Sequence, residues 1–208
     1  MPDLLIATTN TGKIREILPI LAGTSFRLVT LADLGRPIAE PEETGRTFAE
    51  NARLKAEYYA AASGLLTVAE DSGLAIDALD GRPGIHSARY PGSTYPNKFA
   101  NLYNELASFP RPWTARYVCA LAVQSPRSKV QGPLFECSGI VEGEIWPEPR
   151  GTHGFGYDPI FYFPEYDATF GEVDDARKSV VAHRGRAFRQ LREFLLDSGL
   201  WTLDSGLV

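Results

Sequence analysis

LLTVAEDSGLAIDALDG, residues 65–81, sets two adjacent acids directly behind an apolar run. Leu65–Glu70 has the composition of a buried strand, and Leu74–Leu79 is predicted to form a second short extended piece. Ligand sites of α/β sheets lie where strands end, so Asp71 and Ser72 form a candidate catalytic turn. A local Asx turn, in which one of these two side chains bonds the backbone, explains the same residues equally well.

The tetrapeptide Asp-Ser-Gly-Leu occurs three times, at residues 71–74, 197–200 and 204–207. The second copy ends an amphipathic helix, with Gly199 in the position that commonly follows a last helical turn. The third lies at the C-terminal end of the sequence, where chains fray. We therefore expect residues 198–208 to form a loosely ordered tail, and only the first copy to carry chemistry.

Strands and helices are mixed along the rest of the sequence. We predict a helix after the turn TNTGK, bent or ended early by Pro19, and a helix from the T-x-x-E box at Thr47 to Gly64. Further strands are predicted at Asp3–Thr8, Phe26–Leu31, Trp113–Ser125 and Pro133–Ile145, the last two as a hairpin, and further helices at Asn97–Phe109 and Gly185–Gly199. The pattern predicts an α/β fold with a mixed twisted sheet and flanking helices, forming two lobes around a central substrate cleft within a single domain, residues 1–208.

Composition narrows the function classes. The net charge of the 208 residues is −5, without the basic stripe typical of proteins that bind long nucleic acids. No apolar run is long enough for a membrane span. The acidic N-terminal stretch does not resemble an export signal, and Cys119 and Cys137 are expected to be buried thiols, so we expect a cytoplasmic protein.

The turn after the first predicted strand suits a polyphosphate. It groups hydroxyl, amide, backbone N–H and lysine donors at a helix N-terminus, at Thr8, Thr9, Asn10, Thr11, Gly12 and Lys13. The spacing is not that of a Walker loop. The alternative is a plain helix cap with an exposed lysine.

The helix that follows Thr47 carries two polar residues on an apolar face. Asn51 and Lys55 are four residues apart and share that face. Glu42 and Glu43 precede the helix and could direct carboxylates at a metal ion. The alternative is that Lys55 extends along the apolar surface and exposes its ammonium group to water.

Two later stretches suit recognition of a nucleobase. GTHGFGYDPIF, residues 151–161, surrounds Phe155 with glycines that leave its ring open for stacking. RKSVVAHRGRA, residues 177–187, supplies donors at Lys178, His183 and Arg184. A basic helix start is otherwise usually a solvated surface. Together the four groups contain the parts of a nucleoside triphosphate site.

The sequence resembles the Ham1/RdgB-type family of inosine/xanthosine triphosphate pyrophosphatases, which act on noncanonical purine triphosphates. The resemblance covers nearly the whole chain through the motifs ATTNTGKIREI, EETGRTFAENARLKA, AEDSGLAIDALDGRPGIHSARY, GFGYDPIF and AHRGRA. It implies Mg²⁺-dependent hydrolysis of the α–β phosphoanhydride of ITP, dITP and XTP to the monophosphate and pyrophosphate. It also implies a homodimer that removes deaminated purines from the nucleotide pool.

The resemblance also implies roles for individual residues. Asp71 would be the proton acceptor and, with Glu43, a metal ligand, while Lys13 and Lys55 would stabilise phosphate charge. Substrate contacts would come from Thr8, Thr9, Asn10, Thr11, Gly12, Lys13, Asn51, Ser72, Phe155, Gly156, Tyr157, Asp158, Lys178, His183 and Arg184.

This sequence departs from the family pattern at two positions. Ala182 replaces the usual serine before the His-Arg pair, and His86 replaces a more familiar tyrosine. Two other classes of protein share parts of the pattern. One is a Mg²⁺-dependent phosphatase acting on other phosphate esters, and the other is a nucleotide-binding sensor on the same fold.

Overall fold

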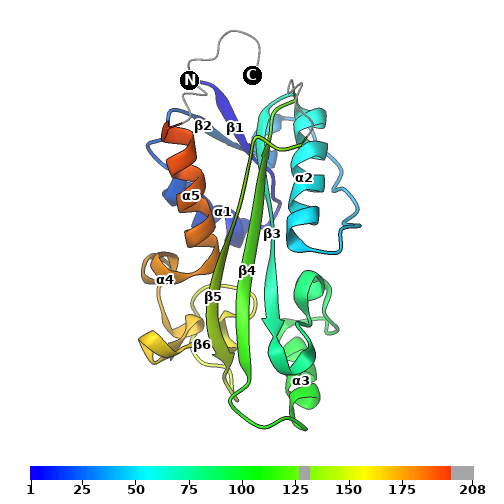
Figure 1. Cartoon of the computed structure of the whole chain (residues 1–208), viewed down its shortest axis with the longest axis vertical. Helices are drawn as coiled ribbons and strands as arrows, with labels where there is room; N and C mark the ends of the chain where they lie inside the picture. The colour runs from blue at the N-terminus through cyan, green and yellow to red at the C-terminus, as the bar shows by residue number, and fades with distance from the viewer. Residues whose placement is uncertain (127–131, 198–208) are drawn as a thin grey trace. The chain divides into compact units, whose positions relative to one another are not determined.

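The computed structural model describes residues 1–126 and 132–197 (Figure 1). The predicted tail at 198–208 therefore lies outside the described residues, as do the third tetrapeptide copy and all but Asp197 of the second. None of the described helices is both long and apolar enough to span a membrane.

Within residues 1–126 and 132–197, seven strands form one sheet in the order β2-β1-β3-β4-β5-β6-β7. Their bounds are β1 Asp3–Ile6, β2 Arg27–Thr30, β3 Leu66–Ile76, β4 Thr114–Gln124, β5 Phe135–Ile145, β6 Phe161–Phe163 and β7 Ala168–Thr169. β1 pairs in parallel with both β2 and β3, whereas β6 is antiparallel to β5 and β7. The predicted mixed α/β sheet is confirmed.

In the described part of the chain, five α-helices accompany the strands. They are α1 Thr11–Leu21, α2 Phe48–Ser63, α3 Tyr95–Leu106, α4 Asp175–Val181 and α5 His183–Asp197. The predicted bounds of α2 are confirmed: Thr47 is its N-cap and accepts from the Glu50 N–H, while Gly64 ends it in the left-handed conformation. The Glu50 carboxylate accepts from the Arg46 N–H.

The chain divides into two compact units. Unit 1 contains residues 1–71, 119–139 and 184–208, and unit 2 contains residues 72–118 and 140–183. β3, β4 and β5 are each divided between the two units, with one part of the strand in unit 1 and the other in unit 2. β4 and β5 are neighbours in the sheet, as the predicted hairpin requires.

Unit 1 has a helical layer on each face of its part of the sheet (Figure 1). Successive strand residues alternate between the two faces. Leu4, Ile6, Leu66 and Val68 pack in one core with α1 and α5, and a second core joins α2 to the intervening side chains Leu5, Ala7, Ala69, Ala120 and Ala122. The same alternation decides which helix each polar residue of β3 meets.

Unit 2 has an aromatic core. Its strands contribute Tyr117, Phe161 and Phe163, and α3 contributes Phe99, Leu102 and Leu106. Phe170, between β7 and α4, is fully buried in the same cluster. The loop with the predicted nucleobase contacts, residues 151–158, belongs to this unit.

Of the two effects predicted for Pro19, the early end of α1 does not occur, since the helix runs through it to Leu21 with Ile17 and Leu21 fully buried on either side. Two other sequence predictions about the elements are wrong. The strand predicted to stop at Glu70 continues to Ile76. His183 and Arg184 lie in the first turn of α5 rather than ahead of it, after the short helix α4, which was not predicted.

Candidate active site

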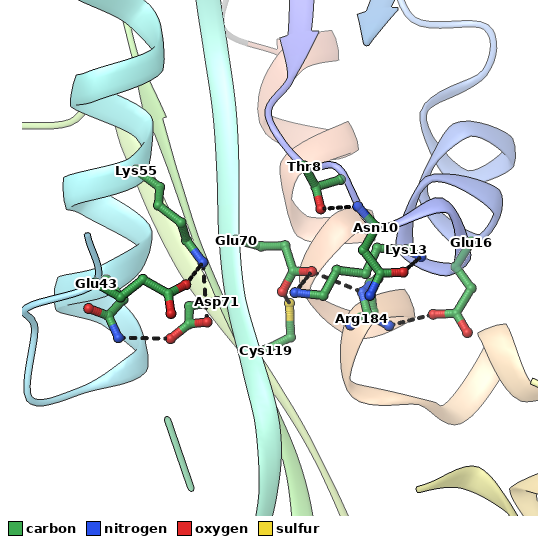
Figure 2. A network of polar contacts seen from close by, with 11 residues as sticks. Thr8, Asn10, Lys13, Glu16, Glu43, Lys55, Glu70, Asp71, Cys119 and Arg184 are labelled. Atoms are coloured by element: carbon green, nitrogen blue, oxygen red, sulfur yellow. Dashed lines mark hydrogen bonds and ion pairs between the residues drawn. The ribbon is translucent and has the colours of Figure 1, made fainter. Parts of the chain in front are cut away.

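The two adjacent acids of β3 serve opposite faces of the sheet in unit 1. Glu70 continues the alternation of Leu66 and Val68 toward α1 and α5, and Asp71 continues that of Ala69 toward α2. Figure 2 shows the two carboxylates on either side of the strand. One residue step along the chain therefore separates two different polar clusters.

On the α2 face, Asp71 is held by two side chains from one helical turn. Asn51 Nδ2 donates to Asp71 Oδ2 at 3.1 Å, and Lys55 Nζ lies 3.2 Å from Asp71 Oδ1. Lys55 Nζ also donates to Glu43 Oε1 at 2.8 Å (Figure 2). Asn51 Oδ1 accepts from the Gly45 N–H at 2.8 Å, which fixes the loop that carries Glu43. The predicted Asp71, Lys55, Asn51 and Glu43 are thus brought together.

Burial sets the electrostatics of this cluster. Asp71 is buried, and burial raises the pKa of its carboxyl group although Lys55 and Asn51 favour the ionised form. Burial also opposes the charge on Lys55, but Asp71 and Glu43 outweigh it and raise the pKa of the ammonium group. Asp71 is therefore a carboxyl group of increased basicity, and it lies beside Lys55, whose ammonium group stays charged.

On the opposite face, Glu70 joins α1 to α5. Lys13 Nζ lies 2.8 Å from Glu70 Oε1, and Arg184 Nε lies 3.4 Å from the same oxygen (Figure 2). Arg184 Nη1 reaches Glu16 Oε2 at 2.5 Å. The Cys119 thiol donates to Glu70 Oε2 at 3.5 Å. Although burial opposes the charge on Glu70, Lys13 and Arg184 lower the pKa of its carboxyl group far below the usual value.

Arg184 is 2 % exposed, so the predicted base reader lies within this ionic network. Glu70 and Glu16 raise the pKa of its guanidinium group against the effect of burial. The role of Arg184 in reading a base stays a prediction. The structure adds a structural role, since the side chain connects α5 to both β3 and α1.

The turn before α1 is organised by its own cap. Asn10 is the N-cap, and its Oδ1 accepts from the Lys13 N–H at 3.2 Å. Thr8 Oγ1 accepts from the Asn10 N–H at 3.2 Å. Thr9, Asn10 and Thr11 are exposed. The turn therefore forms a helix cap, as the alternative interpretation predicted. That interpretation also predicted an exposed lysine, but Lys13 is paired with Glu70.

In unit 2, Asp158 binds two of the other predicted nucleobase contacts, Phe155 and Lys178. Asp158 Oδ2 accepts from the Phe155 N–H at 2.7 Å and from Lys178 Nζ at 2.5 Å. The Lys178 ammonium also lies 5.2 Å from the centre of the Phe155 ring. Gly154 has φ +70°, and a Cβ there would lie 2.1 Å from Asp158 Oδ2. The loop can close on the carboxylate only because residue 154 is glycine.

The other predicted contacts have mixed surroundings. The buried Tyr157 donates its hydroxyl to the Ser87 carbonyl at 2.8 Å, which anchors the loop. Gly156 has φ +69°. Ser72 is half-buried on β3, beside Asp71. The substrate contacts expected from these residues stay predictions.

Sequence reasoning missed Glu16, which pairs with Arg184, and Tyr117, whose hydroxyl donates to Asp158 Oδ1 at 3.4 Å. Glu16 follows Lys13 by three positions on α1, a spacing that places both side chains on one helical face. Tyr117 is an isolated tyrosine of a strand, and no motif surrounds it.

The similarities to known proteins point in one direction. The model of the Ham1 family matches residues 4–194. Two relatives named dITP/XTP pyrophosphatase, from Oceanobacillus iheyensis and Geobacter sulfurreducens, are 42% and 45% identical to this chain. The alignments cover 94% of this chain in both cases, and 98% and 97% of the relatives. The structure of a Ham1 protein from Coxiella burnetii has a TM-score of 0.84 at 36% identity, over 94% of this chain and 98% of that one.

Proposed function

The chain belongs to the Ham1 family, and from that premise we propose that it hydrolyses ITP, dITP and XTP at the α–β phosphoanhydride. The products are the nucleoside monophosphate and pyrophosphate, so the activity removes deaminated purines from the nucleotide pool. The names of the similar proteins support the substrate class. The observation that carries the chemistry is the buried Asp71, held by Asn51 and Lys55 on α2.

Asp71 is the general base of this proposal. A base must be deprotonated and oriented, and the two donors from α2 fix both carboxylate oxygens. The raised pKa increases its affinity for the proton that an attacking water gives up. Lys55 and Lys13 supply the positive charge that a hydrolysed triphosphate needs.

We propose that Glu43 and Asp71 hold Mg²⁺. Both carboxylates contact the same Lys55 Nζ, so their oxygens are neighbours. Magnesium prefers oxygen ligands and is usually bound by one or two carboxylates together with waters and substrate phosphates. Among residues 1–126 and 132–197, no group of three or more His, Cys, Asp or Glu side chains could hold a metal alone. When bound, the ion would supply charge neutralisation and alignment of the triphosphate.

Base discrimination belongs to the side chains of unit 2. Inosine and xanthosine carry a carbonyl at C6 where adenosine carries an amino group. A donor such as Lys178 or His183 can therefore hydrogen-bond to C6 of inosine or xanthosine but not to C6 of adenosine. Phe155 offers a ring for stacking. A donor left unpaired by the wrong base can discriminate by orders of magnitude.

We also propose that the chain acts as a homodimer in the cytoplasm. The family resemblance supports the dimer, and the two free thiols, Cys119 and Cys137, suit a reducing compartment. Light scattering on the purified chain measures the oligomeric state directly.

Pyrophosphate release from a panel of purine triphosphates, with Mg²⁺ and with excess chelator, tests the proposal. We expect release from ITP, dITP and XTP, little from ATP, whose base lacks the C6 carbonyl, and none with chelator. Orthophosphate in place of pyrophosphate would identify a phosphatase. Binding of ITP without turnover above that of Asp71→Asn would identify a nucleotide sensor.

A further inference from the structure

Tyr117 lies on β4 at the centre of the aromatic core of unit 2, 6 % exposed. Its ring centre lies 4.5 Å from that of Phe161 and 6.3 Å from that of Phe170. Both are purely apolar neighbours. Tyr117 differs from them because it also contacts two of the residues assigned to base recognition.

The first contact is with the carboxylate that closes the Phe155 loop. The Tyr117 hydroxyl donates to Asp158 Oδ1 at 3.4 Å, while the other oxygen, Oδ2, accepts from Phe155 N–H and Lys178 Nζ. The side chains of Asp158 and Lys178 are each 2 % exposed, so their orientation is set by the protein rather than by water. Burial raises the pKa of Tyr117 well above its usual value, which keeps the hydroxyl protonated and able to donate.

The second contact is with His183. The Tyr117 and His183 rings stack with centres 4.6 Å apart and an interplanar angle of 15°. His183 is 3 % exposed and begins α5. Because the imidazole lies flat on the phenol ring, the tyrosine fixes the plane in which the ring nitrogens can meet a ligand.

We propose that Tyr117 is a positioning residue for base recognition, orienting His183 through its ring and Asp158 through its hydroxyl. This inference rests on the proposed function, in which His183 and Lys178 donate to the base and Phe155, whose N–H Asp158 holds, stacks on it. Tyr117 itself does not touch substrate. It connects two segments that are distant in sequence, the 154–158 loop and the start of α5.

Two variants separate the two contacts. Tyr117→Phe removes the hydroxyl and keeps the ring, and Tyr117→Leu removes both. Tyr103 provides matched controls in the same unit, because its hydroxyl donates to the Trp146 carbonyl at 2.9 Å and its ring packs on Trp113. Tyr103→Phe and Tyr103→Leu therefore remove comparable groups away from the residues assigned to the base.

Proton NMR of the imidazoles is the direct readout. The sequence has three histidines, and His183→Gln identifies the signals of His183. The stacked phenol ring shifts these signals upfield, so Tyr117→Leu should move them downfield. Tyr117→Phe and Tyr103→Leu should leave them near their original position. Unchanged His183 signals in Tyr117→Leu would overturn the proposed stacking role.

Kinetics provide the functional readout. We expect Tyr117→Phe to raise KM for ITP about 2- to 5-fold and Tyr117→Leu about 10-fold or more, with kcat little changed. The ratio of kcat/KM for ITP to that for ATP should fall in the same order, and the Tyr103 variants should keep it. An equal loss for ITP and ATP in all four variants would show a merely structural role and overturn the inference.

The proposed function can fail separately. If the wild-type protein releases no pyrophosphate from any purine triphosphate, ITP affinity is measured by calorimetry on the same variants. Weaker binding confined to the Tyr117 variants then supports positioning, and equal affinities overturn it.

Discussion

At the residue scale, the Glu70–Asp71 pair shows how one strand step changes the chemistry of a carboxylate. Both side chains are buried and both have lysine partners. Glu70 meets Lys13 and Arg184, and its pKa falls, whereas for Asp71 burial outweighs the cation and its pKa rises. Glu70 therefore remains an ionised structural anchor, and Asp71 is suited to accept a proton.

Asp71→Asn should lower kcat for ITP by at least about 100-fold, because general-base catalysis contributes about 10²–10⁴. Pyrophosphate release measures the loss, and calorimetry should show that ITP still binds. Asp33→Asn is the control, since Asp33 is exposed and only caps the turn at Thr30. Turnover within a few-fold of wild type in Asp71→Asn would remove this residue as the base.

The raised pKa of Asp71 also predicts how this residue affects stability. The folded state then binds the proton more tightly than the unfolded state, so the contribution of Asp71 to folding becomes less favourable as pH rises above 3.8. Asp71→Asn should therefore melt at the same temperature as wild type or higher at pH 7. Thermal denaturation without nucleotide or metal tests this, and a clear destabilisation at pH 7 contradicts the sign of the shift.

At the element scale, the continuity of β3 limits what the sequence could predict. Asp, Ser and Gly are unfavourable in strands, so residues 71–73 indicate a break. The ladder with its neighbours and the burial of Leu74 and Ile76 override that preference. By contrast, α2 was predicted with its correct ends because its cap residues are local signals. Local capping is readable in one sequence, and ladder formation depends on distant strands.

Glu70→Gln should destabilise the protein, because Glu70 connects β3 to α1 and α5 through Lys13 and Arg184. Breaking a buried pair on one side costs about 3–5 kcal/mol. Urea denaturation at pH 7 measures the loss. Glu136→Gln removes the exposed partner of Arg53 and should cost less than about 1 kcal/mol.

The difference in unfolding free energy between wild type and Glu70→Gln should depend on pH. The folded pKa of Glu70 is lowered, so its stabilisation is fully present above the ordinary value of 4.5 and is lost as pH falls below it toward the folded pKa. The difference between wild type and Glu70→Gln should shrink in that acidic range. A difference that stays constant with pH would contradict the role of the charge.

Gly154→Ala should disrupt the loop that presents Phe155. The new Cβ would meet Asp158 Oδ2 at 2.1 Å in a backbone with φ +70°. Gly23→Ala is the matched control, because Gly23 has φ +78° but a Cβ there would have no atom within 4 Å, so only the backbone cost of about 1 kcal/mol applies. We expect a rise in KM for ITP in Gly154→Ala alone. Equal kinetics in the two variants would show that the Asp158 contact does not organise the loop.

At the scale of the whole molecule, the contacts that define the site join segments that are distant in sequence. Arg184 is separated by 168 residues from Glu16 and by 114 from Glu70, and nothing in a single sequence signals these pairings. The motifs identified which residues carry chemistry, but not that Arg184 would be buried among acids. The cleft expected between two lobes likewise stays a prediction.

The two units should unfold together, because β3, β4 and β5 each belong to both. Melting one unit would cut each of these three strands in its middle, whereas units that fold independently are ordinarily joined by linkers. Differential scanning calorimetry should therefore show one transition, with an unfolding enthalpy of about 150 kcal/mol near 60 °C for the 208 residues. The van't Hoff enthalpy should equal the calorimetric value. Glu70→Gln acts on unit 1 and Gly154→Ala on unit 2, yet each should shift the same single transition. Two resolved transitions, with each variant moving only one of them, would show that the units fold independently despite their shared strands.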